Sequence, residues 1–208
     1  MYTRDFWDSV YKLHFDDAPW MSHEWASHGI GLISKYIDIS PENLILDYGC
    51  GNALISDHFY TKGAKVELAE ISEEMIKWLK IRYENKMNIY NVKLPNEIKF
   101  KNRYDYIIAW GVFHHIKPDL WEVFMNGFHR LMKQDALLFI SGWNEEDEVI
   151  IQDNKTARFT GQPVWFINNP INIVDRDKFE VVENNVSKVH LSAFDKLRSV
   201  RNIILRKK

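Results

Sequence analysis

The sequence of 208 residues has little cysteine, no long apolar run and almost no net charge. Cys50 is the only cysteine, which excludes an intramolecular disulfide and a zinc site built from several thiolates. No apolar run is long enough to span a bilayer, and Met1 to Trp7 lacks the apolar centre of a signal peptide. The formal net charge is -2, so bulk charge indicates no nucleic-acid or membrane partner. We therefore expect a cytoplasmic globular protein.

The composition that remains is typical of one α/β domain. Apolar residues make up 46% of the chain and charged residues 27%, a balance that supports a packed core. A chain of this length matches the size of a single domain. We expect three parts within it: an N-terminal helical lid at 1–39, a cofactor-binding core at 40–142, and a variable loop plus closing β-hairpin at 143–208.

The hydrophobic pattern predicts helices and strands in alternation. Helical spacing in the first segment indicates two helices, which an aromatic elbow at 16–20 separates. Short apolar runs then predict strands at 43–47, 65–69, 87–92, 104–110 and 136–141. Helices are expected through Ile55 and Phe59, from the N-cap Ser72, and at 119–132. Repeating β-α units of this kind predict a mainly parallel, doubly wound sheet, and runs at 179–191 and 199–205 predict a hairpin that completes it.

The first predicted strand leads into a glycine loop, Asp47-Tyr48-Gly49-Cys50-Gly51. Ligands of doubly wound sheets bind at the carboxyl ends of the strands, so this loop is the first candidate site. A dinucleotide fingerprint requires a third glycine three residues after Gly51, where this chain has Leu54. Asp47 would repel a pyrophosphate but suits a ligand that carries an ammonium group. The loop therefore favours a cationic ligand and disfavours a nicotinamide dehydrogenase.

A second carboxylate, Glu70, ends the next predicted strand about twenty residues after the loop. A carboxylate at that place can accept both hydrogen bonds of a ribose 2′,3′-diol. Together with Asp47, it indicates a nucleoside that has an amino-acid-like tail and no phosphates. S-adenosylmethionine fits this description.

The motifs, in this order, resemble those of the class I S-adenosylmethionine-dependent methyltransferases of the small-molecule type. Leu46 to Asn52 resembles the first motif of that family, and Glu70 to Met75 resembles its ribose-binding acid with the helix that follows. Tyr104 to Ile116 resembles the fourth motif and the His-His pair after it. The resemblance covers roughly Asn43 to Ser141, with the hairpin in outline. It implies a Rossmann-like doubly wound seven-stranded sheet whose last strand is antiparallel.

The resemblance also implies a set of cofactor contacts. The loop would hold the methionine part, Ile71 would pack on the adenine, and the Trp110 region would line the cofactor near the sulfonium. Where the family often has an aspartate for the adenine amino group, this chain has Asn91-Val92, whose amide can accept the same bond. The expected product is S-adenosylhomocysteine. The implied cofactor residues are Asp47, Gly49, Cys50, Gly51, Glu70, Ile71, Asn91, Val92 and Trp110.

Methyl transfer from a sulfonium is an in-line displacement on an activated donor, so the protein must mainly align the acceptor and exclude water. No metal is required, and Trp110-Gly111 stands where metal-dependent relatives have a chelating acid. An O or N acceptor that loses a proton benefits from a base, for which His114 and His115 are candidates, with His115 preferred. The alternative is that these histidines cap the loop or pack beneath the cofactor.

Three tryptophans are candidates for contact with the acceptor. Trp20 lies in the predicted elbow and is expected to belong to a lid over the site, with a tethering role as the alternative. Trp143 and Trp165 flank the irregular segment after the core and are expected to form an aromatic wall. The alternative for this segment is a loop that buries its own tryptophans.

The C-terminal tail is basic but offers no clear phosphate-binding pattern. Lys196 to Lys208 carries six cations and no acids, and alternating Val200, Ile203 and Leu205 favour a solvated strand face over a nucleic-acid surface. We therefore expect a small-molecule acceptor. A tRNA or protein methyltransferase would need a basic track near the pocket, and a non-catalytic S-adenosylmethionine-binding subunit is the alternative from another class. The sequence indicates no oligomeric state.

Overall fold

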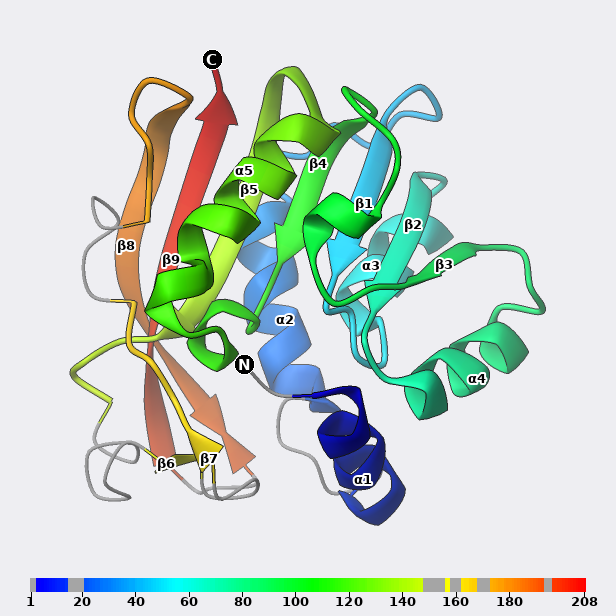
Figure 1. Cartoon of the computed structure of the whole chain (residues 1–208), viewed down its shortest axis with the longest axis vertical. Coiled ribbons are helices and arrows are strands. Elements are labelled where there is room, and N and C mark those ends of the chain that lie inside the picture. Colours follow the sequence, from blue (N-terminus) through cyan, green and yellow to red (C-terminus); the bar gives the residue numbers. More distant parts are fainter. Residues whose placement is uncertain (1–2, 15–20, 148–155, 158–161, 168–172, 193–195) are drawn as a thin grey trace.

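A seven-stranded sheet forms the centre of the computed structural model (Figure 1), which describes residues 3–14, 21–147, 156–157, 162–167, 173–192 and 196–208. The strand order is β3-β2-β1-β4-β5-β9-β8. The first five strands pair in parallel, and β9 is antiparallel to both β5 and β8. The predicted seven-stranded sheet with an antiparallel last strand is confirmed. The strands are β1 (Leu44–Tyr48), β2 (Lys65–Glu70), β3 (Asn88–Asn91), β4 (Tyr104–Ala109), β5 (Met132–Trp143), β8 (Phe179–Leu191) and β9 (Lys196–Lys207).

Helices cover both faces of the sheet, as the alternating pattern predicts. In Figure 1, α5 lies on the near face and α2 on the far face. The helices are α1 (Arg4–His14), α2 (His23–Ile33), α3 (Leu54–Thr61), α4 (Glu73–Arg82) and α5 (Trp121–Leu131), and short 3-10 turns occupy Pro95–Glu97, Phe113–His115 and Pro118–Leu120. A separate two-stranded ribbon joins β6 (Thr156–Ala157) to β7 (Gln162–Pro163).

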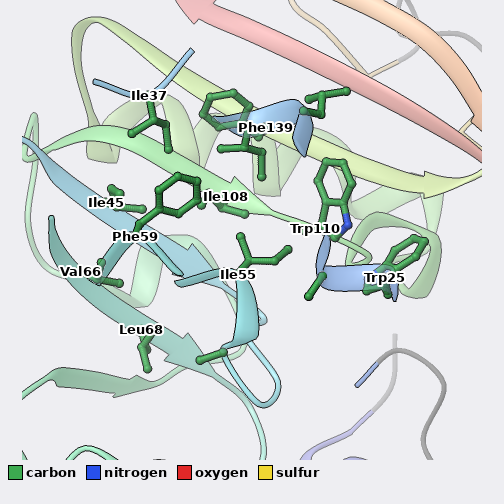
Figure 2. Close-up of a cluster of buried hydrophobic side chains, with 14 of the residues drawn as sticks. Trp25, Ile37, Ile45, Ile55, Phe59, Val66, Leu68, Ile108, Trp110 and Phe139 are labelled. Atoms are coloured by element: carbon green, nitrogen blue, oxygen red, sulfur yellow. The ribbon is translucent and has the colours of Figure 1, made fainter. Parts of the chain in front are cut away.

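Burial on both faces explains why the central strands read as continuous apolar runs. In β1, Ile45 packs in the cluster under α2 and α3, while the next residue, Leu46, packs in the cluster under α5. Figure 2 shows Ile45 beside Phe59 of α3 and Ile108 of β4 in the first cluster. A strand with two covered faces cannot alternate polar and apolar residues, so its sequence carries no period of two.

The two N-terminal helices have different environments. Trp25, Ala26 and Ile33 of α2 are buried in the cluster against the sheet. In contrast, α1 packs on α4 and is held there by the buried side chains of Val10 and Tyr11 together with polar groups. The Asp8 carboxylate accepts hydrogen bonds from the Ser72 hydroxyl at 2.6 Å and from the Glu74 amide at 3.2 Å. Of the segment expected as a lid, α2 therefore packs on the sheet, while α1 packs on α4 and contributes Tyr11 to the same apolar cluster.

Ser72 is the N-cap of α4, as predicted, and its hydroxyl accepts a hydrogen bond from the Met75 amide at 3.2 Å. Strand β5 is longer than the predicted 136–141. It begins at Met132, which pairs with Tyr104, and ends at Trp143, which pairs with Val200 of β9. The pairing with strands distant in sequence extends β5 beyond its apolar centre, an effect that local composition does not encode.

The expectation of a solvated face on the C-terminal strand is wrong. β9 lies between β5 and β8, and Val200, Ile203 and Leu205 are fully buried. Two of its cations, Arg198 and Lys207, are buried as well. The strand is interior because the hairpin inserts β9 into the sheet and leaves β8 at the edge. Among the side chains that the structure describes there, these two cations are therefore withdrawn from the surface of the tail.

Candidate functional site

The register of the parallel strands brings the predicted cofactor residues to one edge of the sheet. Asp47 pairs with Leu68 on one side and with Ile108 on the other, and Glu70 pairs with Asn91. The glycine loop, Ile71, Val92 and Trp110 follow these strands directly, so all lie at the carboxyl ends. In Figure 1, α1 lies on the same side of the molecule as this edge. Trp20 lies outside the described residues.

The glycine loop depends on a backbone conformation that side chains disfavour. Gly49 has φ +70° and Gly51 has φ +51°. The amide of Gly49 donates to the Ala69 carbonyl of β2 at 2.8 Å, which ties the loop to the next strand. A Cβ at Gly49 would lie 2.6 Å from the Cγ2 atom of Val112, in the loop after β4. Glycine is therefore required at position 49 by both φ and space.

Gly49→Ala is expected to lower the free energy of unfolding by about 2–4 kcal/mol, because a left-handed backbone is combined with an overpacked contact. Gly63→Ala is the matched control, since Gly63 has φ +95° and no atom within 4 Å of the added Cβ. It should lose only about 1–2 kcal/mol. Urea unfolding followed by tryptophan fluorescence measures both values. Equal losses would show that the Val112 contact has no effect.

Asp47 is a buried carboxylate at the end of β1 whose charge is unsupported. Its Oδ2 atom accepts a hydrogen bond from the Ser56 hydroxyl of α3 at 2.6 Å. The pKa of Asp47 is raised to about 7, mainly by burial and to a smaller extent by the Glu70 charge, while the Ser56 hydrogen bond opposes the change. The described residues supply Asp47 with no ion pair. A carboxylate in this environment gains most from a cationic ligand group, such as an ammonium.

Glu70 is held by three backbone amides. Its Oε1 atom accepts hydrogen bonds from Ile71 at 2.8 Å and Ser72 at 3.0 Å, and Oε2 accepts one from Gly51 at 3.1 Å. Burial raises the pKa of Glu70, while these three amides lower it and Asp8 raises it. A carboxylate has about four acceptor positions, so one remains for a hydroxyl group. The same bonds join the glycine loop to the start of α4.

Asn91 and Val92 have different surroundings. The Asn91 side chain is exposed; its oxygen accepts a hydrogen bond from Arg4 of α1, and its nitrogen donates to the Ile71 carbonyl at 3.1 Å. Val92 is buried. The amide expected to contact adenine is thus bound to α1, which brings Arg4 to the site as a residue that the sequence analysis did not identify.

Cys50 and Trp110 belong to packed surroundings. Burial raises the pKa of the Cys50 thiol well above its usual range, and Asp47 and Glu70 raise it further, so the thiol stays protonated. The Trp110 ring lies beside Trp25 of α2 at a centroid distance of 6.1 Å (Figure 2), and Gly29 leaves room for it. The ring therefore packs against α2, while the chain after it, at Gly111, continues along the edge of the site.

His114 and His115 lie side by side in the 3-10 turn after β4, with ring centroids 4.0 Å apart. His114 is buried and His115 is half-buried. Burial lowers the pKa of His115 to about 3. Burial, together with His115 and Arg198, lowers the pKa of His114 well below its usual range. Both rings are therefore neutral at physiological pH, and neither is a strong base.

Trp143 and Trp165 lie next to the histidines but in different ways. The Trp143 ring, at the end of β5, is buried 5.0 Å from the His114 ring and 5.3 Å from the Trp25 ring. The Trp165 amide donates to the His114 carbonyl at 3.0 Å. Trp165 and Ile167 thus lie against the turn after β4 and the end of β5. Trp143 lies behind His114, and only the half-buried Trp165 ring is partly accessible.

A cavity of about 500 Å³ lies at the opposite, amino ends of the strands. Two of the cations that line it are paired: Arg103 contacts Glu67 at 2.6 Å, and Lys133 contacts Asp105 at 2.8 Å. It is far from the glycine loop in the sheet, so it is separate from the candidate site. Among the described residues, no group of three metal-ligating side chains exists, and no helix is long and apolar enough to cross a membrane.

The fold defines a protein of the doubly wound α/β class, with two buried carboxylates at the carboxyl ends of β1 and β2. Residues 20–181 match the model of a methyltransferase domain, and the chain belongs to this family. The resemblance to class I S-adenosylmethionine-dependent methyltransferases is thereby confirmed.

A curated relative and two solved structures give the range of similarity. The chain is 30% identical to the ubiquinone biosynthesis O-methyltransferase of Pelagibacter ubique over 103 residues, which is 49% of this chain and 42% of that protein. The match thus spans less than half of the relative. The magnesium protoporphyrin IX methyltransferase of Synechocystis, solved with S-adenosylhomocysteine, has a TM-score of 0.75 at 14% identity and covers 99% of this chain and 98% of its own. The 1,6-didemethyltoxoflavin-N1-methyltransferase of Burkholderia thailandensis has a TM-score of 0.73 at 16% sequence identity. That match covers 99% of this chain and 87% of the Burkholderia protein. At these identities the structures show the fold.

Proposed function

We propose that the protein transfers the methyl group of S-adenosylmethionine to an oxygen or nitrogen atom of a small molecule. The observation that carries this proposal is the buried Asp47 carboxylate, whose pKa is raised to about 7 at the carboxyl end of β1. A pyrophosphate would be repelled there, whereas an ammonium group would stabilise the charge. The glycine loop leaves the backbone open to close approach.

The residues present fit the cofactor. Asp47 would bind its ammonium group, and the remaining acceptor position of Glu70 would bind a ribose hydroxyl. Ile71 and the buried Val92 would pack on the adenine, and Asn91 would contact its edge while it stays bound to Arg4. The loop residues Gly49, Cys50 and Gly51 would line the methionine part, next to the turn that follows Trp110. When bound, S-adenosylmethionine supplies a methyl group already activated for displacement.

Within this site, we assign His115 to the acceptor side and His114 to its support. His115 is half-buried and contacts Trp7 of α1 edge to face at 5.1 Å, whereas His114 is covered by Trp143. Because the pKa of His115 is lowered to about 3, its ring accepts a proton weakly, and its main role is to orient the acceptor. α1 would cover the site and exclude water.

The surface formed by His115 and Trp7 suits a small acceptor with an apolar or ring-shaped part. Trp165 and Trp20 remain candidates for contact with the acceptor. Trp143 would contribute indirectly, through its contact with His114. Two relatives are named for small-molecule substrates, 1,6-didemethyltoxoflavin and magnesium protoporphyrin IX. A nucleic-acid acceptor is disfavoured because the cations of β9 are largely bound within the fold; Arg201, for example, donates to Asn184 at 2.9 Å. The expected location stays the cytoplasm.

A transfer assay with methyl-labelled S-adenosylmethionine tests this proposal. The protein is incubated with a panel of small hydroxyl- and amine-bearing compounds, and both labelled products and S-adenosylhomocysteine are measured. We expect label on at least one acceptor, and much less label with Asp47→Asn at the same S-adenosylmethionine concentration. Binding of the cofactor without any transfer across the panel would instead support a non-catalytic subunit. Transfer to tRNA or to a protein alone would contradict the assignment of a small-molecule acceptor.

A further inference from the structure

A continuous column of side chains links the closing hairpin to α1 across the acceptor end of the site. The Cζ atom of Arg198, on β9, lies 3.9 Å from the centroid of the Trp143 ring. The Trp143 and His114 ring centroids are 5.0 Å apart, those of His114 and His115 are 4.0 Å apart, and those of His115 and Trp7 are 5.1 Å apart. Four separate segments of the chain thus contribute to one stack.

The Arg198 end of the column is rigidly held. Arg198 is only 1% exposed, and its Nε atom lies 3.1 Å and 2.9 Å from the two carboxylate oxygens of Asp147. The same carboxylate accepts a hydrogen bond from the Ser199 amide at 2.8 Å. A planar guanidinium fixed in this way has one orientation over the Trp143 face, where a cation is attracted to the aromatic ring.

The middle of the column depends on packing. The His114 backbone is fixed because its carbonyl accepts the Trp165 amide. Its Nδ1 atom is buried and makes no hydrogen bond within the described part of the chain. The Trp143 and His115 rings pack on either side of this imidazole and restrict its orientation. A movement of the Trp143 ring would therefore change the packing of His114.

We propose that Arg198 is a positioning residue for the acceptor side of the site: it holds the plane of Trp143, and through Trp143 and His114 it sets the orientation of His115. The inference rests on the proposed function, in which His115 faces the acceptor. It explains why a fully buried cation from the hairpin stacks on the last residue of β5 instead of reaching solvent. The Arg198 charge also lowers the pKa of His114, which keeps the column neutral beside a cationic cofactor.

The test combines histidine NMR spectra of the ligand-free protein with calorimetric titration of S-adenosylmethionine. His114→Gln and His115→Gln identify two C2–H signals among the eight histidines. In Arg198→Met, both signals should shift, and the affinity for S-adenosylmethionine should fall about two- to tenfold, the range expected when ring contacts loosen. Arg206→Met is the matched control on the same strand, because the Arg206 side chain is exposed and forms an ion pair with Glu180 at 3.2 Å; it should change neither measurement.

Trp143→Leu keeps the Arg198–Asp147 pair but interrupts the column. It therefore tests whether the column orients His115 even if Arg198→Met does not fold. It should shift the His115 signal in the same direction. An unchanged His115 signal in a folded Trp143→Leu or Arg198→Met protein would overturn the inference and leave Arg198 with a purely structural role. Failure of the wild type to bind S-adenosylmethionine would instead contradict the proposed function, while the NMR result would still test the column.

Discussion

Asp47→Asn is expected to weaken binding of S-adenosylmethionine by about 10- to 100-fold, the loss typical when a charged hydrogen bond becomes neutral. The substitution keeps the size of the side chain and an oxygen that can accept the Ser56 hydrogen bond. Only the negative charge is lost. Asp57→Asn is the matched control, since Asp57 lies on α3 and contacts Arg82 at 3.0 Å, away from the loop. Its affinity should equal that of the wild type.

The same charge predicts a pH dependence. Below a pKa of about 7, Asp47 is protonated in the free protein, and an ammonium ligand binds the ionised form. Affinity should therefore rise with pH up to about 7, by at most tenfold per pH unit, and then level off. Calorimetry in buffers of different ionisation enthalpy should show proton release on binding below pH 7. In Asp47→Asn, the release and the slope should both disappear. An unchanged slope in this variant would contradict the assignment.

Asp47→Asn should also stabilise the ligand-free protein. The pKa of Asp47 rises on folding from its usual value near 4 to about 7, so wild-type stability falls as pH increases between these values and is constant above them. The variant lacks this fall and should gain up to about 4 kcal/mol at pH 8. A variant with a lower affinity for S-adenosylmethionine and a higher free energy of unfolding identifies Asp47 as a binding group. Substitution of a purely structural residue would instead lower both the affinity and the stability.

The second large effect is expected at the buried Asp147–Arg198 pair, whose two side chains are 0% and 2% exposed. Asp147→Ala should lower the free energy of unfolding by about 3–5 kcal/mol, because the guanidinium keeps its charge in the interior. Urea unfolding at neutral pH measures the loss.

The double variant Asp147→Leu with Arg198→Met is the control for this prediction. Apolar residues of similar volume often replace a buried ion pair at little cost, so the double variant should be more stable than Asp147→Ala alone. Equal losses in the two proteins would show that packing around Trp143, not an uncompensated charge, determines stability there.

The sequence was sufficient to predict the sheet because its signals are local. The run at Leu44–Tyr48 is short, apolar and followed by glycines, and Ser72 is a capping residue before two acids. Where an element depends on distant pairing, prediction was incomplete. The ends of β5 are set by Tyr104 and Val200, and β9 is buried because the hairpin inserts it into the sheet.

The residues of the candidate site also differ in whether local sequence signals or only tertiary contacts reveal them. Asp47 and Glu70 could be identified because each ends a strand, and the fold brings such ends together. Arg4, Asp8, Asp147 and Arg198 could not be identified. They are single charged residues without a spacing signal. Only the tertiary contacts show that Arg4 binds the end of β3, that Asp8 binds the start of α4, and that Asp147 and Arg198 pair in the interior.

The direction of the Trp110 side chain could not be predicted from the sequence either. Its position after β4 matches the family motif, but the ring packs on α2 beside Gly29. The direction of a side chain at the end of a strand depends on which neighbour leaves room, and Gly29 lies more than one element away in the sequence.

The most direct test of the central claim is calorimetric titration of the protein with S-adenosylmethionine, S-adenosylhomocysteine and NAD at pH 8. Two buried carboxylates at the carboxyl ends of β1 and β2 and the leucine at position 54 predict saturable binding of both sulfur nucleosides and none of NAD. S-adenosylmethionine should lose affinity in Asp47→Asn. Binding of NAD without either sulfur nucleoside would contradict the account and would reassign the glycine loop to a dinucleotide.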